Sequence, residues 1–422
     1  MSSLFLKIVN MSIAASWLIL AVVLLRVVLK KAPKWINVLL WGIVAFRLIC
    51  PFSFESALSL IPSAETISPE IMMDWTPEIS TGVSSIDKVV NPIITDTFAP
   101  EPIASANPLQ LLIPVLAIVW AIGIIAMLVY AAVSYFRLQK KVGASLSVRD
   151  NIWICDDIQT PFILGFFKPS IYIPSGTDEA QLPYIIAHEN AHLKRCDHWW
   201  KPLGYLVLAI HWFNPLVWIA YILLCRDIEL ACDEKVIRGL NQNESISYSE
   251  ALLSCSVNRR TVMVCPLAFG EVGVKERVKN VLNYKKPAFW IVAIAVVSSI
   301  VLGVCFLTNP SSFPVKLDSV QISKASTMDF RTNSGPTTFQ LNVSEIDELS
   351  SRIKHLKIGQ KDQSLQGHTP FYSLNVDTRE NDRITFSGFD SNGNQSAILY
   401  ENVYYRITDS DFISYLQRIC AG

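Results

Sequence analysis

The chain has 422 residues, which is room for two or three domains. Its charged fraction of 17% is below the ~25% of soluble domains, and its hydrophobic fraction of 51% is concentrated in long runs, so a wholly soluble protein is excluded. Lys and Arg (36) balance Asp and Glu (36), and a net charge of zero gives no electrostatic argument for binding nucleic acid. Nine cysteines form no CxxC pair and no regular framework.

Three apolar runs in the first 136 residues predict membrane-spanning helices. They extend approximately from Leu4 to Leu29, Ile36 to Cys50 and Leu109 to Phe136. The second run is short. The first is followed by basic residues and lacks a cleavage pattern of small residues, so we expect a retained anchor and not a secretion signal. Loop 51–108 between the second and third runs carries eight acidic residues and one basic residue, Lys88.

After the third run, residues 151–174 predict short strands at Ile152–Cys155, Phe162–Leu164 and Ser170–Ile173, separated by prolines and a glycine. Such a strand edge can bind an extended peptide by backbone pairing. A small structural sheet that only packs on a neighbouring helix agrees with the sequence equally well.

The most informative motif is His188-Glu189-Asn190-Ala191-His192. Histidines at i and i+4 lie on one face of a helix, so both imidazoles can reach one metal ion. The intervening Glu189 can take a proton from a metal-bound water. This HExxH pattern is the signature of a zinc peptidase.

A further apolar stretch, Leu203 to Leu224, has the length of a spanning helix but is interrupted by His211, Asn214 and Pro215. Each half is too short to span a bilayer. We therefore predict a hairpin over 203–224 that dips into the membrane and returns. A return is also required if Glu229, which follows the stretch, is to reach the zinc.

Glu229 and Asp233 stand at i and i+4. Glu229 is the predicted third zinc ligand, and Asp233 can accept the free ring N–H of a liganding histidine. The alternative is a solvated acidic face paired with Arg226 or Lys235. Asp197 is predicted either to support a histidine or to form an ordinary ion pair with its neighbour Arg195. His198 and His211 rank below Glu229 as ligands, and Cys232 is predicted to be a packed small hydrophobe.

A fourth apolar run, Phe289 to Leu307, predicts the last span. Basic residues follow the first run (Arg26, Lys30, Lys31, Lys34), follow the third (Arg137, Lys140, Lys141) and precede the fourth (Lys279, Lys285, Lys286). By the positive-inside rule the N-terminus and loop 51–108 are extracytoplasmic, residues 137–286 are cytoplasmic, and residues 309–422 are outside. The predicted location is a bacterial cell membrane, crossed several times.

Several segments together resemble the BlaR/MecR family of sensor-transducer membrane zinc peptidases (antirepressors). They are HENAHLKRCDHWW (His188–Trp200), HWFNPLVW (His211–Trp218), ELACD (Glu229–Asp233), PFILGFFKPSIYIP (Pro161–Pro174) and FGEVGVKERVKNVLNYKKP (Phe269–Pro287). The resemblance covers residues 1 to about 308. It implies zinc ligands His188, His192 and Glu229, Glu189 as base, a cytoplasmic substrate that is commonly a winged-helix repressor, and often self-cleavage.

The tail departs from the family members that sense beta-lactams, which carry a larger penicillin-binding domain. Ser351 and Lys354 form an SxxK, but it lies in a predicted helix, Ser344–Leu356, and has no KTG partner, so we interpret the match as chance. Predicted strands are Phe339–Val343, Tyr372–Val376, Ile384–Phe389 and Ala397–Ile407, and a second helix is Asp409–Cys420. Residues 309–422 are therefore predicted to form a small α+β domain, a candidate sensor.

The predicted fold class is an α-helical polytopic membrane protein with a cytoplasmic zincin-like domain (137–286), a fourth transmembrane helix (287–308) and the α+β tail. The predicted function is a zinc endopeptidase that transduces an extracytoplasmic signal into proteolysis of a repressor and, in addition, of itself. Two alternatives stay open: a housekeeping membrane protease of the quality-control or CAAX kind, and a non-proteolytic receptor with a structural metal site. The sequence does not fix the oligomeric state, although a dimer is compatible with it.

Overall fold

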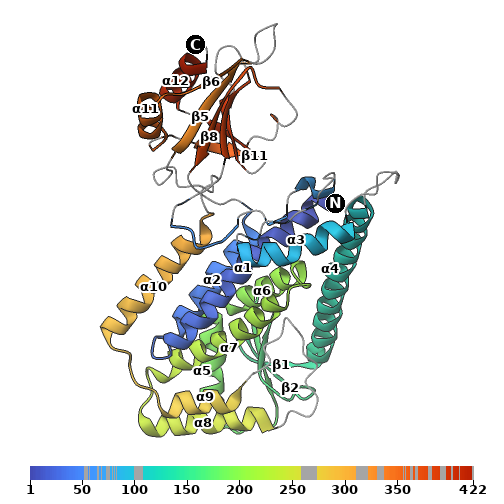
Figure 1. The fold of residues 1–422 in the computed structure, drawn as a ribbon. Coiled ribbons are helices and arrows are strands. Elements are labelled where there is room, and N and C mark those ends of the chain that lie inside the picture. The colour runs from blue at the N-terminus through green and yellow to red at the C-terminus, as the bar shows by residue number, and fades with distance from the viewer. Residues whose placement is uncertain are drawn as a thin grey trace. The chain divides into compact units, whose positions relative to one another are not determined.

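A computed structural model describes residues 1–51, 108–257 and 273–309, together with most of 56–98 and of 322–420. The chain divides into two compact units, Met1–Pro310 and Ser311–Gly422 (Figure 1). Each unit has its own hydrophobic core and is described separately below.

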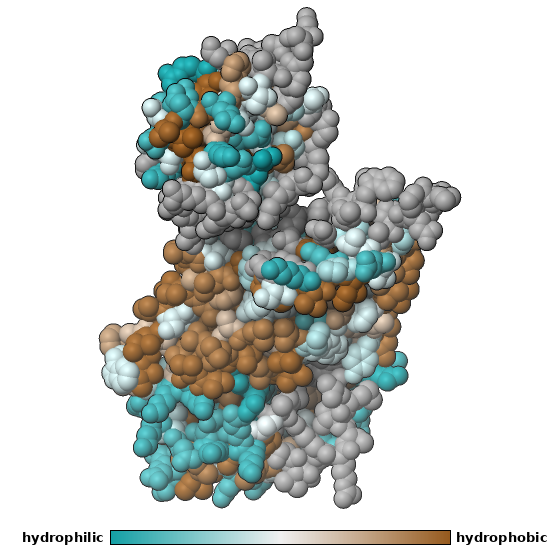
Figure 2. Space-filling view, viewed as in Figure 1, coloured by the Kyte–Doolittle hydropathy of each residue, from teal (hydrophilic) through white to brown (hydrophobic). Residues whose placement is uncertain are grey.

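Long apolar helices form the frame of the first unit. Among the described residues, α1 (Ser2–Val28), α4 (Pro108–Lys141) and α10 (Phe289–Leu307) are long and apolar enough to cross a membrane. The second predicted span, α2 (Lys34–Ile49), has 16 residues, and its length of about 24 Å is short of a ~30 Å hydrocarbon core. In Figure 2 hydrophobic residues gather in a belt over α10 and the neighbouring helices, whereas hydrophilic residues dominate the end that carries α8 and α9.

The stretch predicted to form a hairpin contains two helices, α6 (Asp197–Ile210) and α7 (Pro215–Ile237), with a break at residues 211–214. Asn214 caps α7 by accepting a hydrogen bond from the backbone N–H of Leu216 at 2.9 Å. The ring of Tyr205 lies against that of Tyr221, so the chain reverses and the two helices run antiparallel. The return helix extends beyond the predicted stretch and carries Glu229 and Asp233 back toward the start of α6.

A four-stranded sheet precedes the helix that bears the HExxH motif. Its strands are β1 (Leu146–Arg149), β2 (Ile152–Cys155), β3 (Phe162–Leu164) and β4 (Ser170–Pro174), in the order β1-β2-β4-β3. The three predicted strands are present, and β1, which is exposed along its whole length, was not predicted. Ile163 and Ile171 of the sheet pack against Ile186 of α5 (Leu182–Lys194), so the sheet supports that helix.

Helices α8 (Gln242–Val257) and α9 (Val274–Leu282) pack together at the polar end of the unit. Loop 51–108 contains two further elements that were not predicted, the 3₁₀ turn Pro69–Met72 and α3 (Ser84–Phe98). A second 3₁₀ turn, Val142–Ala144, follows α4.

The second unit is built on a seven-stranded antiparallel sheet in the order β6-β5-β8-β9-β10-β11-β7. Its strands are β5 (Ile322–Asp329), β6 (Thr337–Gln340), β7 (Ile358–Lys361), β8 (Tyr372–Thr378), β9 (Arg383–Gly388), β10 (Ser396–Tyr400) and β11 (Val403–Ile407). Helices α11 (Val343–Ile353) and α12 (Ser410–Cys420) contribute Leu349 and Leu416 to its core. The α+β character of this unit agrees with the sequence pattern.

Two predictions for the second unit were wrong in detail. The single strand Ala397–Ile407 is a hairpin, in which Tyr400 of β10 pairs with Val403 of β11, and the polar residues Glu401 and Asn402 interrupt the apolar run between them. The strand Phe339–Val343 ends at Gln340, because Asn342 and Glu345 form a capping box that begins α11 at Val343. Strands β5 and β7 were not predicted.

Candidate metal centre

The two histidines of the HExxH motif lie on one buried face of α5. His188 and His192 are one helical turn apart, and their Nε2 atoms are 3.1 Å from one another. A proline in the first turn, where its missing N–H leaves no helical bond unmade, favours the start of this helix. Two ring nitrogens aimed at one point in a buried site are stable when a proton or a cation lies between them.

Glu229 of α7 completes a triangle of donor atoms. Its Oε2 lies 3.5 Å from His188 Nε2 and 3.6 Å from His192 Nε2. Ligand atoms that are each 2.0–2.1 Å from a tetrahedral zinc lie about 3.3 Å from one another, close to the three observed separations. These three residues therefore form a group that could hold one metal ion, and their separations fit the size of zinc.

The outward ring nitrogens of both histidines are held by other buried side chains. His192 Nδ1 lies 2.9 Å from Asp197 Oδ2, which also contacts Arg195 Nε at 3.2 Å. Asp197 thus makes both of the contacts that the sequence left open. The buried Cys232 donates its S–H to the same carboxylate oxygen at 3.2 Å. Burial raises the pKa of the Cys232 thiol well above its usual value, so this residue stays neutral.

His188 is held in a corresponding way by residues of α7 and α8. Its Nδ1 lies 2.9 Å from the hydroxyl of Tyr248 and 3.3 Å from Asp233 Oδ1. The same hydroxyl donates to Asp233 Oδ1 at 2.6 Å. Contacts of this kind fix the orientation of a metal-binding imidazole, so that both histidines direct Nε2 toward the shared point.

Two buried cations neutralise the carboxylates of α7. Lys201 Nζ donates to Glu229 Oε1 at 2.9 Å, while Arg277 of α9 forms two 2.7 Å bonds with Asp233. The acidic face is thus paired with Lys201 and Arg277, and not with Arg226 or Lys235 as the alternative interpretation required. Because Oε1 of Glu229 is held by Lys201, Oε2 is the oxygen that faces the histidines.

The protonation of the centre reflects this concentration of negative charge. Burial by itself lowers the pKa of His188, but hydrogen bonds with Asp233 and Glu229 raise it to about 10. Burial would raise the pKa of Asp233, and the Arg277 guanidinium instead holds it far below its usual value. The metal-free site therefore retains a proton where it could hold a divalent cation.

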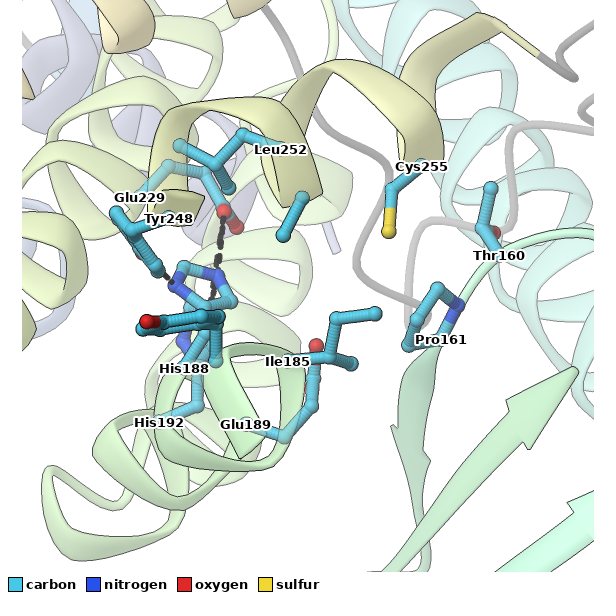
Figure 3. Close-up of a pocket in the computed structure, with 12 residues that line it drawn as sticks. Thr160, Pro161, Ile185, His188, Glu189, His192, Glu229, Tyr248, Leu252 and Cys255 are labelled. Carbon is cyan, nitrogen blue, oxygen red and sulfur yellow. Dashed lines mark hydrogen bonds and ion pairs between the residues drawn. The ribbon is translucent and has the colours of Figure 1, made fainter. Parts of the chain in front are cut away.

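Glu189 lies next to the three donors and lines the same cavity, which has a volume of about 30 Å³ (Figure 3). That space accommodates a water molecule. Tyr248, Leu252 and Cys255 of α8 approach from one side and Ile185 of α5 from the other, while Thr160 and Pro161 lie just before β3. Position and residue type make Glu189 suited to act on a water in this cavity.

His198 and His211, the other two histidines among the described residues, do not belong to this group of donors. His211 is buried at the break between α6 and α7, where its Nδ1 contacts the backbone oxygen of Val207 at 3.1 Å. His198 is partly exposed beside Trp199 at the start of α6. A second group that could hold a metal, His192, Asp197 and Cys232, is explained by the contacts that orient His192.

A buried ion pair fixes the start of the functional half of α7. Asp227, two residues before Glu229, is fully buried and accepts bonds from Arg26 Nε and Nη2, each at 2.7 Å. Trp41 Nε1 donates to the same carboxylate at 2.9 Å. Helix α7 is therefore attached to the C-terminal end of α1 and to the middle of α2, and this attachment in turn sets the position of Glu229.

Sequence reasoning placed His188, His192, Glu229, Asp233, Asp197 and Glu189 in one centre, and the structure brings all six together. It missed Lys201, Tyr248 and Arg277, which contact Glu229, Asp233 or His188 across separations of 15 to 89 residues. No local spacing connects residues so far apart in the chain.

Residues 6–281 match the family described as BlaR1 peptidase M56. Because this is more than half of the chain, the chain belongs to that family of metallopeptidases, and the resemblance found in its motifs is confirmed. The long apolar helices agree with the membrane location of such signal transducers.

Two curated proteins with names of the same family are similar to part of this chain. The methicillin resistance mecR1 protein of Staphylococcus aureus (strain Mu50 / ATCC 700699) is 32% identical over 136 residues, which is 30% of this chain and 23% of that protein. The regulatory protein BlaR1 of Bacillus licheniformis is 29% identical over 164 residues, 36% of this chain and 27% of that protein. The aligned region thus spans about a quarter of the length of these relatives.

Proposed function

We propose that this protein is a zinc-dependent membrane endopeptidase with His188, His192 and Glu229 as metal ligands and Glu189 as general base. The observation that carries the proposal is the triangle of donor atoms, 3.1 to 3.6 Å on a side, in the cavity that Glu189 also lines. Two imidazoles, one carboxylate and an open position form a donor set typical of catalytic zinc.

Bound zinc would lower the pKa of a coordinated water and polarise the scissile carbonyl. Glu189 takes the proton from a water in the cavity and passes it to the amine of the departing peptide. Asp197 and Tyr248 keep the imidazoles directed inward, and Lys201 holds Glu229 so that one carboxylate oxygen faces the metal. A site with a structural metal alone has no need of a buried carboxylate at this position, which favours an enzyme over a non-proteolytic receptor.

The substrate is proposed to be a cytoplasmic protein that binds in extended form. Strand β3 is an edge of the four-stranded sheet, and the two residues before it line the cavity. An edge strand beside a catalytic centre can pair with a substrate backbone. The resemblance to sensor-transducer antirepressors implies a transcriptional repressor of the winged-helix kind as substrate, with cleavage of the receptor itself as a second reaction, and the regulatory name of BlaR1 agrees with such a role.

The proposed topology has residues 137–286 in the cytoplasm, with the α6–α7 hairpin entering the membrane from that side. The unit Ser311–Gly422 is the proposed extracytoplasmic sensor, joined to the peptidase by α10. Basic residues at the C-terminal end of α4 and before α10 support this orientation.

The test compares intact cells that express wild type or Glu189→Gln at equal levels, with mass spectrometry of new protein termini after envelope stress. We expect new termini in a small repressor or in the receptor only with wild type, while both proteins contain zinc. Identical termini in the two strains, under a stress that induces a reporter of the wild-type pathway, would contradict the proposed role of Glu189. A truncation lacking residues 309–422 that responds normally would favour a housekeeping protease.

A further inference from the structure

We infer that Arg277 is a positioning residue of the metal centre, and that through it the segment leading into α10 acts on the metal. The inference rests on the proposed zinc site. It concerns a residue that lies 44 positions after Asp233 and belongs to a different helix.

The Arg277 side chain is enclosed in the centre. Only 1% of the residue is exposed, although an arginine on a short polar helix is ordinarily solvated. Its Nε and Nη2 bond both oxygens of Asp233 at 2.7 Å, a bidentate arrangement with fixed geometry. The guanidinium thereby determines where Asp233 stands.

Weaker contacts connect Arg277 with two proposed ligands directly. Its Nη1 lies 3.3 Å from Glu229 Oε2, and its Nη2 lies 3.3 Å from His188 Nε2. A second route passes from Asp233 through the Tyr248 hydroxyl to His188 Nδ1, at 2.6 and 2.9 Å. The Arg277 guanidinium therefore contacts the metal-facing atoms of Glu229 and His188. It also fixes Asp233, which holds the other ring nitrogen of His188.

Helix α9, which carries Arg277, is joined to α10 by a short linker. Six residues (283–288) join Leu282, the end of α9, to Phe289, the start of α10. Helix α10 is held independently, since Ala295 packs into a cluster with Leu29 and Ile36 of the α1–α2 region. An axial shift of α10 is thus transmitted through a short linker to the helix that carries Arg277.

The first test measures the zinc affinity of the full-length chain in lipid nanodiscs by competition with a chelator, and the thermal stability of the metal-free protein. We expect Arg277→Met to weaken zinc binding by roughly 10- to 100-fold, as loss of groups that support metal ligands does, and Arg277→Lys to recover part of the loss. Lys279→Met, on the exposed face of the same helix, is the matched control and should bind like wild type.

A double variant separates positioning from simple neutralisation of charge. In Arg277→Met/Asp233→Asn the carboxylate that Arg277 neutralised is replaced by a neutral amide. The stability of the metal-free protein should therefore recover, while zinc affinity stays low because the positioning contacts are still absent. Recovery of both quantities would overturn the positioning role. Failure of the wild type to bind zinc would instead contradict the proposed function itself.

The second test shortens the linker by deleting Lys285 and Lys286, which draws α9 and α10 together by up to about 7 Å. Lys285→Gln/Lys286→Gln removes the same charges at constant length and serves as the control. We expect the deletion, but not the control, to weaken zinc binding in wild type and to cause no further loss in Arg277→Met. An unchanged affinity after deletion, or an equal loss in both backgrounds, would overturn the connection through Arg277.

Discussion

The buried pair between Arg26 and Asp227 offers a quantitative test of how α7 is held. Replacing Arg26 by Met removes two 2.7 Å hydrogen bonds from the Asp227 carboxylate, which is 0% exposed. That carboxylate then keeps the hydrogen bonds from Trp41 at 2.9 Å and from Asn37 at 3.4 Å. Breaking a buried ion pair on one side costs about 3–5 kcal/mol, and the retained indole donor places this case near the lower end. We therefore expect Arg26→Met to destabilise the first unit by about 3 kcal/mol.

The assay is thermal unfolding of the full-length chain in nanodiscs, where a loss of this size lowers the midpoint by on the order of 5 °C or more. Lys30→Met, an exposed position near the end of the same helix, is the control. Adding Asp227→Asn should restore most of the lost stability, since no charge then remains buried. An Arg26→Met protein as stable as Lys30→Met, or one that Asp227→Asn does not rescue, would refute the reasoning.

Three further predictions concern the centre and the second unit. Tyr248→Phe removes the hydroxyl between His188 and Asp233, so zinc affinity should fall about 10-fold in a chelator competition, and an unchanged affinity would contradict this role. The hydrogen bonds with Asp233 and Glu229 overcome the effect of burial and raise the pKa of His188 from 6.5 to about 10. The stability that this proton gives the metal-free protein is fully present below pH 6.5, the pKa of the histidine in the unfolded chain. It is lost as the pH rises toward about 10, the pKa in the folded protein. Zinc must displace the same proton, so its affinity should increase about tenfold per pH unit between roughly pH 7 and 9, measured by titration. Leu416→Ala, at a fully buried position of α12, should cost about 2–5 kcal/mol in denaturant unfolding of the second unit and leave zinc affinity unchanged.

The proposed ligands could be predicted because His188 and His192 form a local motif and Glu229 forms an i, i+4 pair with Asp233. His188 and His192 are separated by one helical turn, and Glu229 follows a stretch that has to return if the metal is to gain a third donor. Lys201 and Arg277 gave no comparable signal, since in sequence they look like ordinary basic residues near a membrane surface. Their burial arises only when α6 and α9 pack on α7, which is a property of the tertiary structure.

The second unit shows a similar division. Strand β8 and helix α12 follow from clear apolar periodicity, whereas the reversal between Tyr400 and Val403 is marked in the sequence only by the polar pair Glu401 and Asn402 and was missed. The capping box of Asn342 and Glu345 was readable from sequence and would have placed the start of α11 correctly.

X-ray absorption of the zinc-loaded, full-length protein tests the central claim most directly. Coordination by His188, His192 and Glu229 predicts nitrogen and oxygen neighbours at about 2.0–2.1 Å and no sulfur neighbour. A sulfur scatterer at about 2.3 Å would place zinc at His192, Asp197 and Cys232 instead, and would contradict the assignment of the catalytic centre.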